Sequence, residues 1–322
     1  MTRPLRIGSR ESTLAVRQAE IVAEGIRRAS PDIEIVFQTM KTQGDVILDR
    51  PLDKIGGKGL FIAELDEALL AGRIDLAVHS LKDMPAELAD GLAIAAYSRR
   101  EDPRDVLVLP EGVPEDAPEG AQEAGGYWAP LGCSGGRRKL LAAKAFPGWG
   151  TKDIRGNVPT RIAKLDAGQY GGLILAAAGL KRLGLEGRIS RYLDCETFIP
   201  SAGQGILAVT CRADDLAQGR IPEAAAVDDA ESRVCATAER AFVKETGGGC
   251  SAPMAAWGRI ENGRLRVHGL YGEEGSTRFV TKIVDTALTG DIRQDEETAQ
   301  SAGVMLARLL LAQFREGEGR GA

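Results

Sequence analysis

Histidine is scarce in this chain, which contains only His79 and His268 among its 322 residues. So few imidazoles leave little material for a multi-histidine metal site or for Ser-His catalysis, and we expect no bound metal. Cysteine is sparse too, because the five thiols are an odd number and include no C-x-x-C pair. This pattern argues against a disulfide framework and against a zinc ribbon.

Long apolar runs are missing as well. No stretch approaches the roughly 18 uncharged apolar residues that a membrane-spanning helix needs, so we expect no membrane partner. Residues 1–10 lack the apolar segment of a secretory signal. The composition, with 43% hydrophobic and 27% charged residues, is that of an ordinary soluble protein. We therefore expect two or three domains and a location in a reducing cytoplasm.

A large excess of one charge is also lacking, since the net charge is −5. This value disfavours a generic nucleic-acid binder. The charge is nevertheless uneven, with −7 over residues 101–123 and +7 over residues 133–164. A solvated helix face would produce such a basic run, but its setting favours an anion site. Arg137 and Arg138 follow Gly-Cys-Ser-Gly-Gly, Arg155 lies in Arg-Gly-Asn-Val, and guanidinium groups bind carboxylates in bidentate fashion.

The hydrophobic pattern predicts an α/β chain in three parts. Strand and helix patterns alternate in the first hundred residues, which implies a largely parallel sheet with covering helices. A second alternating unit follows an acidic loop, and a smaller α+β unit begins near residue 223. The expected strands are 5–8, 33–40, 74–79, 92–97, 152–157, 172–178, 206–212, 254–260, 265–270 and 277–284. The expected helices are 12–29, capped by Ser12, then 60–71, 137–145, 160–167, 228–245 and 298–314, with a frayed tail over 315–322. The predicted domains are 1–105 with 206–222, 106–205, and 223–322.

Two strand ends carry polar residues that suit ligand binding. The segment Gly8-Ser9-Arg10-Glu11-Ser12 joins a strand to a helix, and a helix N-terminus with an arginine is an anion site, although Ser12 could simply be a cap. His79-Ser80-Leu81-Lys82-Asp83-Met84-Pro85 follows another strand, and ligands of open α/β sheets lie beyond the carboxyl ends of strands. Lys82 could bind an anion there while Asp83 acts on a cation. A loop salt bridge between the two explains the pair equally well.

Glycine-rich segments mark two further candidates. Gly247-Gly248-Gly249 precedes Cys250, and such small neighbours would let a large group approach the sulfur. A buried structural thiol is the alternative, because thiolate character depends on neighbours that the sequence does not reveal. The segment Gly56-Gly57-Lys58-Gly59 lacks the Walker A pattern, so we interpret it as a mobile lid with Lys54 and Lys58 facing a ligand.

Taken in order along the chain, these segments resemble the porphobilinogen deaminase (hydroxymethylbilane synthase) family. Each match is modest alone, whereas their joint order over nearly the whole chain is specific. The matching segments are Ser9-Arg10-Glu11-Ser12, Lys41-Thr42-Gln43-Gly44-Asp45, Gly56-Gly57-Lys58-Gly59-Leu60-Phe61, His79-Ser80-Leu81-Lys82-Asp83-Met84-Pro85, Arg155-Gly156-Asn157-Val158, Ala178-Gly179-Leu180-Lys181-Arg182-Leu183, Gly203-Gln204-Gly205 and Gly248-Gly249-Cys250.

This resemblance implies a fold and an activity. The fold is α/β, with two domains like type II periplasmic binding proteins and a smaller C-terminal α+β domain. The activity is that of a transferase, which joins four porphobilinogen molecules head to tail into 1-hydroxymethylbilane and releases ammonia in tetrapyrrole biosynthesis. The resemblance also implies a dipyrromethane cofactor held covalently through Cys250. A monomer is implied, whose partners are porphobilinogen and the growing pyrrole chain rather than nucleic acid.

The resemblance also implies roles for individual residues. Asp83 is the implied catalytic carboxylate, which would hold pyrrole N–H groups, assist protonation of the departing amine and stabilise the cation that follows. The acetate and propionate groups of porphobilinogen suit the matched arginines. The implied cofactor-binding residues are Cys250, Ser12, Lys82, Asp83, Ser134, Arg137, Arg138 and Arg155. The implied substrate-binding residues are Arg10, Arg155, Arg161 and Arg182, and the implied lid contains Lys54, Lys58 and Phe61.

Two departures from the family pattern bear on these assignments. The family usually has Gly-Thr-Ser-Ser-Leu-Arg-Arg where this chain has Gly132-Cys133-Ser134-Gly135-Gly136-Arg137-Arg138. The two glycines at 135 and 136 would loosen the helix start by about 1 kcal/mol each relative to alanine. Pro159 stands where glycine is usual, and proline is tolerated at the first helical position. A cytoplasmic carboxylate-binding or sensor protein on the same two-lobed fold, or an inactive family member, stays open as an alternative.

Overall fold

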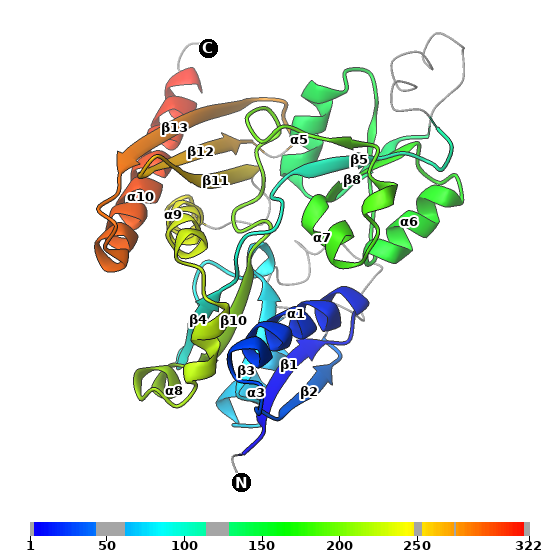
Figure 1. The fold of residues 1–322 in the computed structure, drawn as a ribbon. Helices are drawn as coiled ribbons and strands as arrows, with labels where there is room; N and C mark the ends of the chain where they lie inside the picture. Colours follow the sequence, from blue (N-terminus) through cyan, green and yellow to red (C-terminus); the bar gives the residue numbers. More distant parts are fainter. Residues whose placement is uncertain (1–2, 43–61, 114–128, 248–252, 274, 319–322) are drawn as a thin grey trace.

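The computed structural model describes residues 3–42, 62–113, 129–247, 253–273 and 275–318. These residues form three units, each with its own sheet. Figure 1 shows the first unit at the bottom of the view, the second at the upper right and the third at the upper left. The predicted architecture of two α/β domains with a smaller C-terminal α+β domain is confirmed. The domain limits at residues 105, 205 and 222 stay predictions.

The first domain is built on a five-stranded sheet with the order β2-β1-β3-β10-β4. Its strands are β1 (Leu5–Arg10), β2 (Ile35–Met40), β3 (Leu76–Ser80), β4 (Leu92–Tyr97) and β10 (Leu207–Arg212). Its helices are α1 (Thr13–Ala29), α3 (Ala63–Leu70), α8 (Ala213–Ala217) and the 3-10 helix η5 (Pro222–Val227). The prediction of a largely parallel sheet is confirmed for β1, β2, β3 and β4, while β10 alone in this sheet runs antiparallel, to β3 and β4. The reason is the chain path, because β4 leads out of this sheet and β10 brings the chain back from the second domain.

Helix α1 shows why these elements form where they do. The Ser12 hydroxyl accepts a hydrogen bond from the Ala15 amide at 3.3 Å, so the predicted cap is confirmed. Apolar residues recur every three or four positions, and Ala19, Val22 and Ile26 are at most 1% exposed. This face packs on the strands of the first sheet and fixes the helix N-terminus at the end of β1.

The second domain has a mixed sheet with the order β7-β6-β8-β5-β9. Its strands are β5 (Asp105–Val108), β6 (Leu131–Cys133), β7 (Thr151–Asp153), β8 (Gly172–Ala176) and β9 (Arg191–Tyr192). Its helices are α5 (Gly136–Ala145), α6 (Val158–Asp166), α7 (Ala177–Arg182) and the 3-10 helix η4 (Glu186–Arg188). β5, β6 and β9 were not predicted. The predicted strand over 172–178 ends at Ala176, because the next residues begin α7.

The third domain packs two helices on one face of an antiparallel meander. Its strands are β11 (Met254–Glu261), β12 (Arg264–Gly272) and β13 (Phe279–Ala287), and its helices are α9 (Ala230–Glu245) and α10 (Ile292–Glu318). Helix α10 begins six residues before the predicted start, where Asp291 and Asp295 accept backbone N–H groups and cap the first turn. It also continues through residues 315–318, so the prediction of a frayed tail was wrong there.

One buried carboxylate joins all three domains. Glu239 on α9 is fully buried and accepts hydrogen bonds from Arg100 Nη2 at 2.6 Å, the Gly203 amide at 2.6 Å and the Gly258 amide at 2.7 Å. Arg100 and Gly203 lie on the two segments that cross between the first and second domains. Gly205 follows with a φ of +93°, and a Cβ there would lie 2.2 Å from the Glu101 carbonyl oxygen. Only glycine fits at this crossing.

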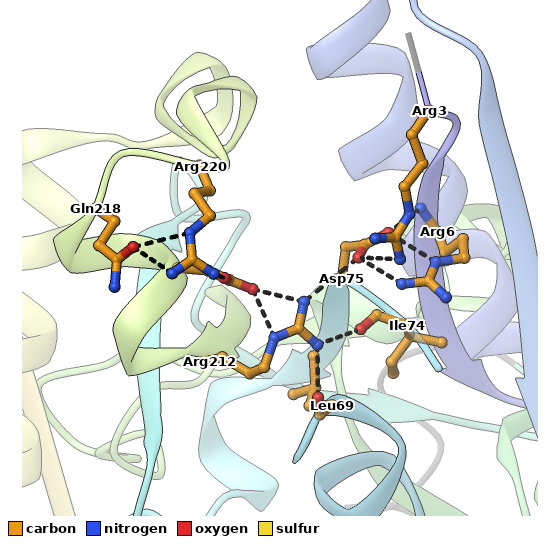
Figure 2. Close-up of polar contacts among 9 residues, drawn as sticks. Arg3, Arg6, Leu69, Ile74, Asp75, Arg212, Gln218 and Arg220 are labelled. Carbon is orange, nitrogen blue, oxygen red and sulfur yellow. Dashed lines mark hydrogen bonds and ion pairs between the residues drawn. The ribbon is translucent and has the colours of Figure 1, made fainter. Parts of the chain in front are cut away.

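A second charged cluster closes the far end of the first sheet, away from the carboxyl ends of β1 and β3 (Figure 2). Asp75 accepts from Arg6 at 2.7 and 2.9 Å and also pairs with Arg3 and Arg212. Arg212 donates in turn to the carbonyls of Leu69 and Ile74 at 2.6 and 2.8 Å. Because β10 ends at Arg212, the cluster ties this late strand to the N-terminal strand.

Candidate functional site

The carboxyl ends of β1 and β3 place the first group of candidate residues together. These parallel neighbours end at Arg10 and Ser80, so the residues that follow share one edge of the sheet. Arg10 is half-buried, and Ser12 caps α1 next to it. Lys82 and Asp83 form the 3-10 turn η3 (Leu81–Asp83) directly after β3. The structure thus brings the two candidate segments to the same edge of the sheet.

The backbone around η3 is held in place by buried side chains and hydrogen bonds, while the carboxylate of Asp83 is exposed to solvent. The Leu81 amide donates to the Ile206 carbonyl at 3.0 Å, and Leu81 and Met84 are buried. Arg240 on α9 donates to the Pro85 and Ala86 carbonyls at 3.1 and 2.8 Å. Asp83 itself is exposed. The turn therefore presents an exposed carboxylate on a fixed backbone.

Lys82 is half-buried and turns toward the crossing segment. Its ammonium donates to Gln204 Oε1 at 3.3 Å. Burial and the positive charges of Arg138 and Arg137 lower the pKa of Lys82 to about 8, against the opposing effect of Asp83 and Asp105. Among the described residues, Lys82 and Asp83 form no ion pair with each other. The loop salt bridge considered from the sequence is thus not what holds this turn.

The second domain contributes a pair of arginines from the first turn of α5. Arg137 Nη1 donates to Asp105 Oδ2 at 2.7 Å and to the Ile199 carbonyl at 2.8 Å. Arg138 donates to Asp105 Oδ1 through Nε at 3.1 Å and Nη2 at 2.7 Å. Asp105 is fully buried. Burial alone would raise the pKa of Asp105, but Arg137 and Arg138 hold it well below its ordinary value, so the carboxylate stays ionised.

The start of α5 corrects one expectation about glycine. Gly135 is the N-cap residue rather than a helical one, and its φ of +86° suits glycine better than any L-residue. Only Gly136 lies in the helix, so the predicted loosening applies to one position. Cys133 is fully buried on β6, and burial raises the pKa of its thiol to about 11. Ser134 donates its hydroxyl to the Ile154 carbonyl at 2.5 Å.

Helix α6 places Arg161 beside both domains. Asn157 caps the helix through the Thr160 amide at 2.9 Å, and Pro159 occupies the second helical position rather than the first, where its missing N–H is equally harmless. Arg161 Nε donates to the Gly156 carbonyl at 2.7 Å. Burial and the charge of Arg138 lower the pKa of Arg161 to about 10, with Asp83 acting in the opposite direction. The charge of Asp83 in the first domain therefore acts on Arg161 in the second domain.

Arg182 lies in the second domain next to the crossing segment that contains Gly205. It ends α7, and its Nη2 donates to the Gly205 carbonyl at 2.6 Å. A groove of about 730 Å³ lies between α1 and the end of α7, and its lining includes Glu11, Thr13 and Arg182. Burial lowers the pKa of Arg182 to about 10, opposed by Glu101. Arg155 is half-buried just before α6, and its carbonyl accepts from Lys164 at 3.0 Å.

Several expected site residues lie outside the described residues, namely Cys250, Lys54, Lys58 and Phe61. Other residues of the site were not expected, and Asp105, Gln204 and Arg240 are the main ones. Gln204 stands inside a matched motif, which is a signal that could have found it. Asp105 belongs to the acidic run, and nothing in its local sequence distinguishes it from its neighbours.

The arrangement suits a ligand with several carboxylates. An exposed aspartate, Asp83, and cationic groups from both domains act on the same residues of this region. Arg10 and Asp83 act on His79, Asp83 and Arg138 act on Lys82, and Asp83 acts on Arg161. Charged forks of this kind bind carboxylates strongly. The residues present therefore fit a pyrrole cofactor with acidic side chains. In the part of the chain that the structure describes, no helix is long and apolar enough to cross a membrane.

Comparisons with known proteins point to one family. A family profile described as "Porphobilinogen deaminase, dipyromethane cofactor binding domain" matches residues 5–219, and one described as "Porphobilinogen deaminase, C-terminal domain" matches residues 233–312. A protein of Acetivibrio thermocellus named porphobilinogen deaminase is 48% identical over 304 residues, which are 94% of this chain and 98% of that protein. One of Alkaliphilus oremlandii with the same name is 46% identical over 91% of this chain and 93% of its own length.

Solved structures resemble the chain more distantly. The periplasmic aliphatic sulphonate binding protein SsuA from Escherichia coli is 15% identical, with a TM-score of 0.40 over 77% of this chain and 72% of its own. The effector binding domain of a BenM variant is 13% identical, with a TM-score of 0.37 over 69% of this chain and 93% of its own.

Proposed function

We propose, because the chain belongs to the porphobilinogen deaminase family, that it is an active hydroxymethylbilane synthase. It would join four porphobilinogen molecules head to tail into 1-hydroxymethylbilane and release ammonia. The observation that carries this proposal is the exposed carboxylate of Asp83 on an anchored turn, on which the charge of Arg161 from the second domain acts. A plain carboxylate-binding protein would need the arginines but not this aspartate.

The family's dipyrromethane cofactor, when bound, supplies the primer to which substrate units are added. Cys250 would hold it covalently. The other residues that would hold it are charged or hydroxyl-bearing, and they are Ser12, Lys82, Asp83, Ser134, Arg137, Arg138 and Arg155. The paired arginines support this role, because Asp105 and the Ile199 carbonyl occupy only part of their N–H donors.

Asp83 would work on the substrate. Its carboxylate would accept hydrogen bonds from pyrrole N–H groups and hold the substrate amine in its protonated ammonium form. When the C–N bond breaks, ammonia leaves with the bonding pair, and the carboxylate would stabilise the positive charge left on the ring. Arg10, Arg155, Arg161 and Arg182 bind the acetate and propionate groups and set the ring against Asp83. Lys54, Lys58 and Phe61 would form a lid that excludes water.

The departures at the start of α5 do not favour an inactive protein. The side chain of Cys133 is in the core of the second domain, so a hydroxyl there would not face a ligand. Gly135 has a backbone conformation that a serine would strain. Neither change removes a charged group of the site.

The test is an intact-mass measurement combined with an ammonia assay. Protein made in cells with normal haem synthesis should exceed its sequence mass by one dipyrromethane, and porphobilinogen should release ammonia. Cys250→Ala is the matched control, and it should have the bare mass and no turnover. A bare wild-type mass without ammonia release, but with tight carboxylate binding, would favour the sensor alternative.

We also propose a monomer that acts in the cytoplasm without metal, membrane or nucleic acid. The basis for the monomer is that the site draws its charged groups from two domains of one chain. Light scattering of the purified protein tests this point, and a stable dimer would contradict it. Turnover that survives exhaustive chelation would support the absence of a metal.

A further inference from the structure

A buried chain of polar contacts runs from Lys82 to the paired arginines, and Gln204 is its central link. Gln204 is 1% exposed. Its Oε1 accepts from Lys82 Nζ at 3.3 Å, and its Nε2 donates to the Pro103 carbonyl at 2.8 Å and to Asp105 Oδ1 at 3.1 Å. One side chain thus contacts the first domain and the second domain at once.

The orientation of the Gln204 amide follows from its partners. An amide has one acceptor oxygen and two N–H donors. Pro103 and Asp105 offer only acceptors, so they take both donors and direct the oxygen toward the Lys82 ammonium. Asp105 carries the contact onward, since the oxygen that Gln204 meets also accepts from Arg138.

The backbone of Gln204 leaves its side chain little freedom to follow another path. Gly203 and Gly205 on either side have φ values of +76° and +93°. The Gln204 carbonyl accepts from Arg100 Nη1 at 3.0 Å, and the Gly205 carbonyl accepts from Arg182 at 2.6 Å. The amide is therefore held at a fixed point of the crossing between the domains.

We propose that Gln204 is a positioning residue, which sets the ammonium of Lys82 relative to Arg137 and Arg138. Its effect on turnover rests on the proposed function. A neutral amide is required in this place for a physical reason. Glutamate would bring a second carboxylate against Asp105. An apolar side chain would remove the acceptor that Gln204 offers to the half-buried Lys82 ammonium, and it would leave Asp105 with its two arginine partners only among the described residues.

The measurement is the pH dependence of Lys82 acylation in the holoenzyme, followed by mass spectrometry of the Lys82 peptide. Four charged groups act on Lys82, namely Asp83, Asp105, Arg137 and Arg138. In Gln204→Glu a carboxylate faces the ammonium, so the titration midpoint should rise by about 1 pH unit. In Gln204→Met the midpoint should fall, because the acceptor is lost. A role in packing alone would leave the midpoint unchanged.

Turnover is measured on the same proteins. Both variants should lose about tenfold in kcat, with a smaller change in KM. Gln218→Glu is the control, because this exposed glutamine holds Arg220 at the far end of the first sheet (Figure 2), and it should leave midpoint and turnover unchanged. If Gln204→Glu does not fold, the midpoint of Gln204→Met decides.

Two results would overturn the proposal: a Lys82 midpoint in both variants equal to that of the wild type, or wild-type kcat in both. The lysine titration needs no turnover. A wild-type protein that releases no ammonia would therefore contradict the proposed function, while the titration would still decide whether Gln204 holds Lys82.

Discussion

Two carboxylates of the candidate site have opposite surroundings, and this difference decides what each can do. Asp83 is exposed on η3, whereas Asp105 is fully buried between two guanidinium groups. A buried carboxylate among charged donors stays ionised and orients those donors. An exposed one can meet a ligand and exchange a proton. We therefore expect Asp83 to take part in the proposed chemistry, whereas Asp105 orients the arginines.

Replacing Asp83 by asparagine should lower turnover by about 10²–10⁴-fold, because the amide keeps the shape but can neither transfer a proton nor balance a cation. Folding should persist, since the side chain is exposed. Ammonia release measures the loss of turnover, and thermal unfolding measures whether the variant still folds. Asp90→Asn, on the exposed surface of the same domain, is the control and should be active. Wild-type turnover in Asp83→Asn would contradict the assigned role.

We expect the buried imidazole of His79 to make the stability of the folded protein sensitive to acid. Burial, then Arg10, lower the pKa of His79 to about 4 from 6.5. The unfolded chain therefore takes up the proton first as the pH falls. Above pH 6.5 the neutral His79 makes its full contribution to the free energy of unfolding, about 3 kcal/mol. This contribution decreases as the pH falls below 6.5 and is lost as the pH falls through 4. Urea unfolding at a series of pH values measures it. His79→Gln should flatten this part of the profile, and an unchanged slope would contradict the prediction.

The first turn of α5 shows how an element can depend on one backbone angle. Gly135 stands outside the helix with φ +86° and ψ 146°, a region that essentially only glycine occupies. This conformation turns the chain from β6 into the helix that carries Arg137 and Arg138. The glycine that departs from the family pattern therefore serves the position of the arginines.

Gly135→Ala should destabilise the protein by about 1–3 kcal/mol, because the added Cβ is strained at this angle. The matched control is Gly136→Ala, one residue later inside the helix, which should be neutral or stabilising by up to about 1 kcal/mol. Chemical denaturation of both variants gives the comparison. Equal effects of the two substitutions would show that Gly135 has ordinary helical geometry.

The elements that the sequence predicts well are those with a long apolar period or a clear cap. Helix α1 has both, and its bounds agree with the prediction. Strand β6 has three residues and β9 has two, which is too short for any alternation to be visible. Their pairing comes from neighbours far along the chain. The early start of α10 was missed because its first turn is polar and is stabilised by aspartate caps rather than by an apolar face.

The candidate site divides in the same way. Residues that follow a strand, such as Arg10 and Lys82, could be placed from local patterns because strand ends have a fixed place in α/β folds. The motif around Gln204 could have marked this residue, but its contacts could not be predicted, since they reach 122 and 99 residues along the chain to Lys82 and Asp105. A local pattern holds no information about contacts at that separation.

At the scale of the whole molecule, the domains meet at Glu239. The carboxylate accepts from Arg100 and from two backbone amides that belong to different parts of the fold. The first and second domains also touch directly where α1 approaches α7. The relative placement of the charged groups that the two domains supply thus depends on this junction.

Replacing Glu239 by glutamine should cost about 3–5 kcal/mol, because it leaves Arg100 without its buried counter-charge. Unfolding should also lose its single transition as the domains separate. Glu245→Gln is the control, since its pair with Arg308 is largely exposed and is worth less than about 1 kcal/mol. Calorimetry distinguishes one transition from several. If the Glu239→Gln variant unfolds in a single transition with wild-type stability, the proposed role of Glu239 in joining the domains would be wrong.

The position of β10 also determines when the protein can be completed during synthesis. β3 and β4 leave the ribosome early, but the strand between them is made only after the whole second domain. Until then both strands have an open edge, and open edges pair readily with other chains. The contact between Asp75 and Arg212 also forms late, because Arg212 is synthesised 137 residues after Asp75. The N-terminal domain is therefore begun first and finished after its neighbour.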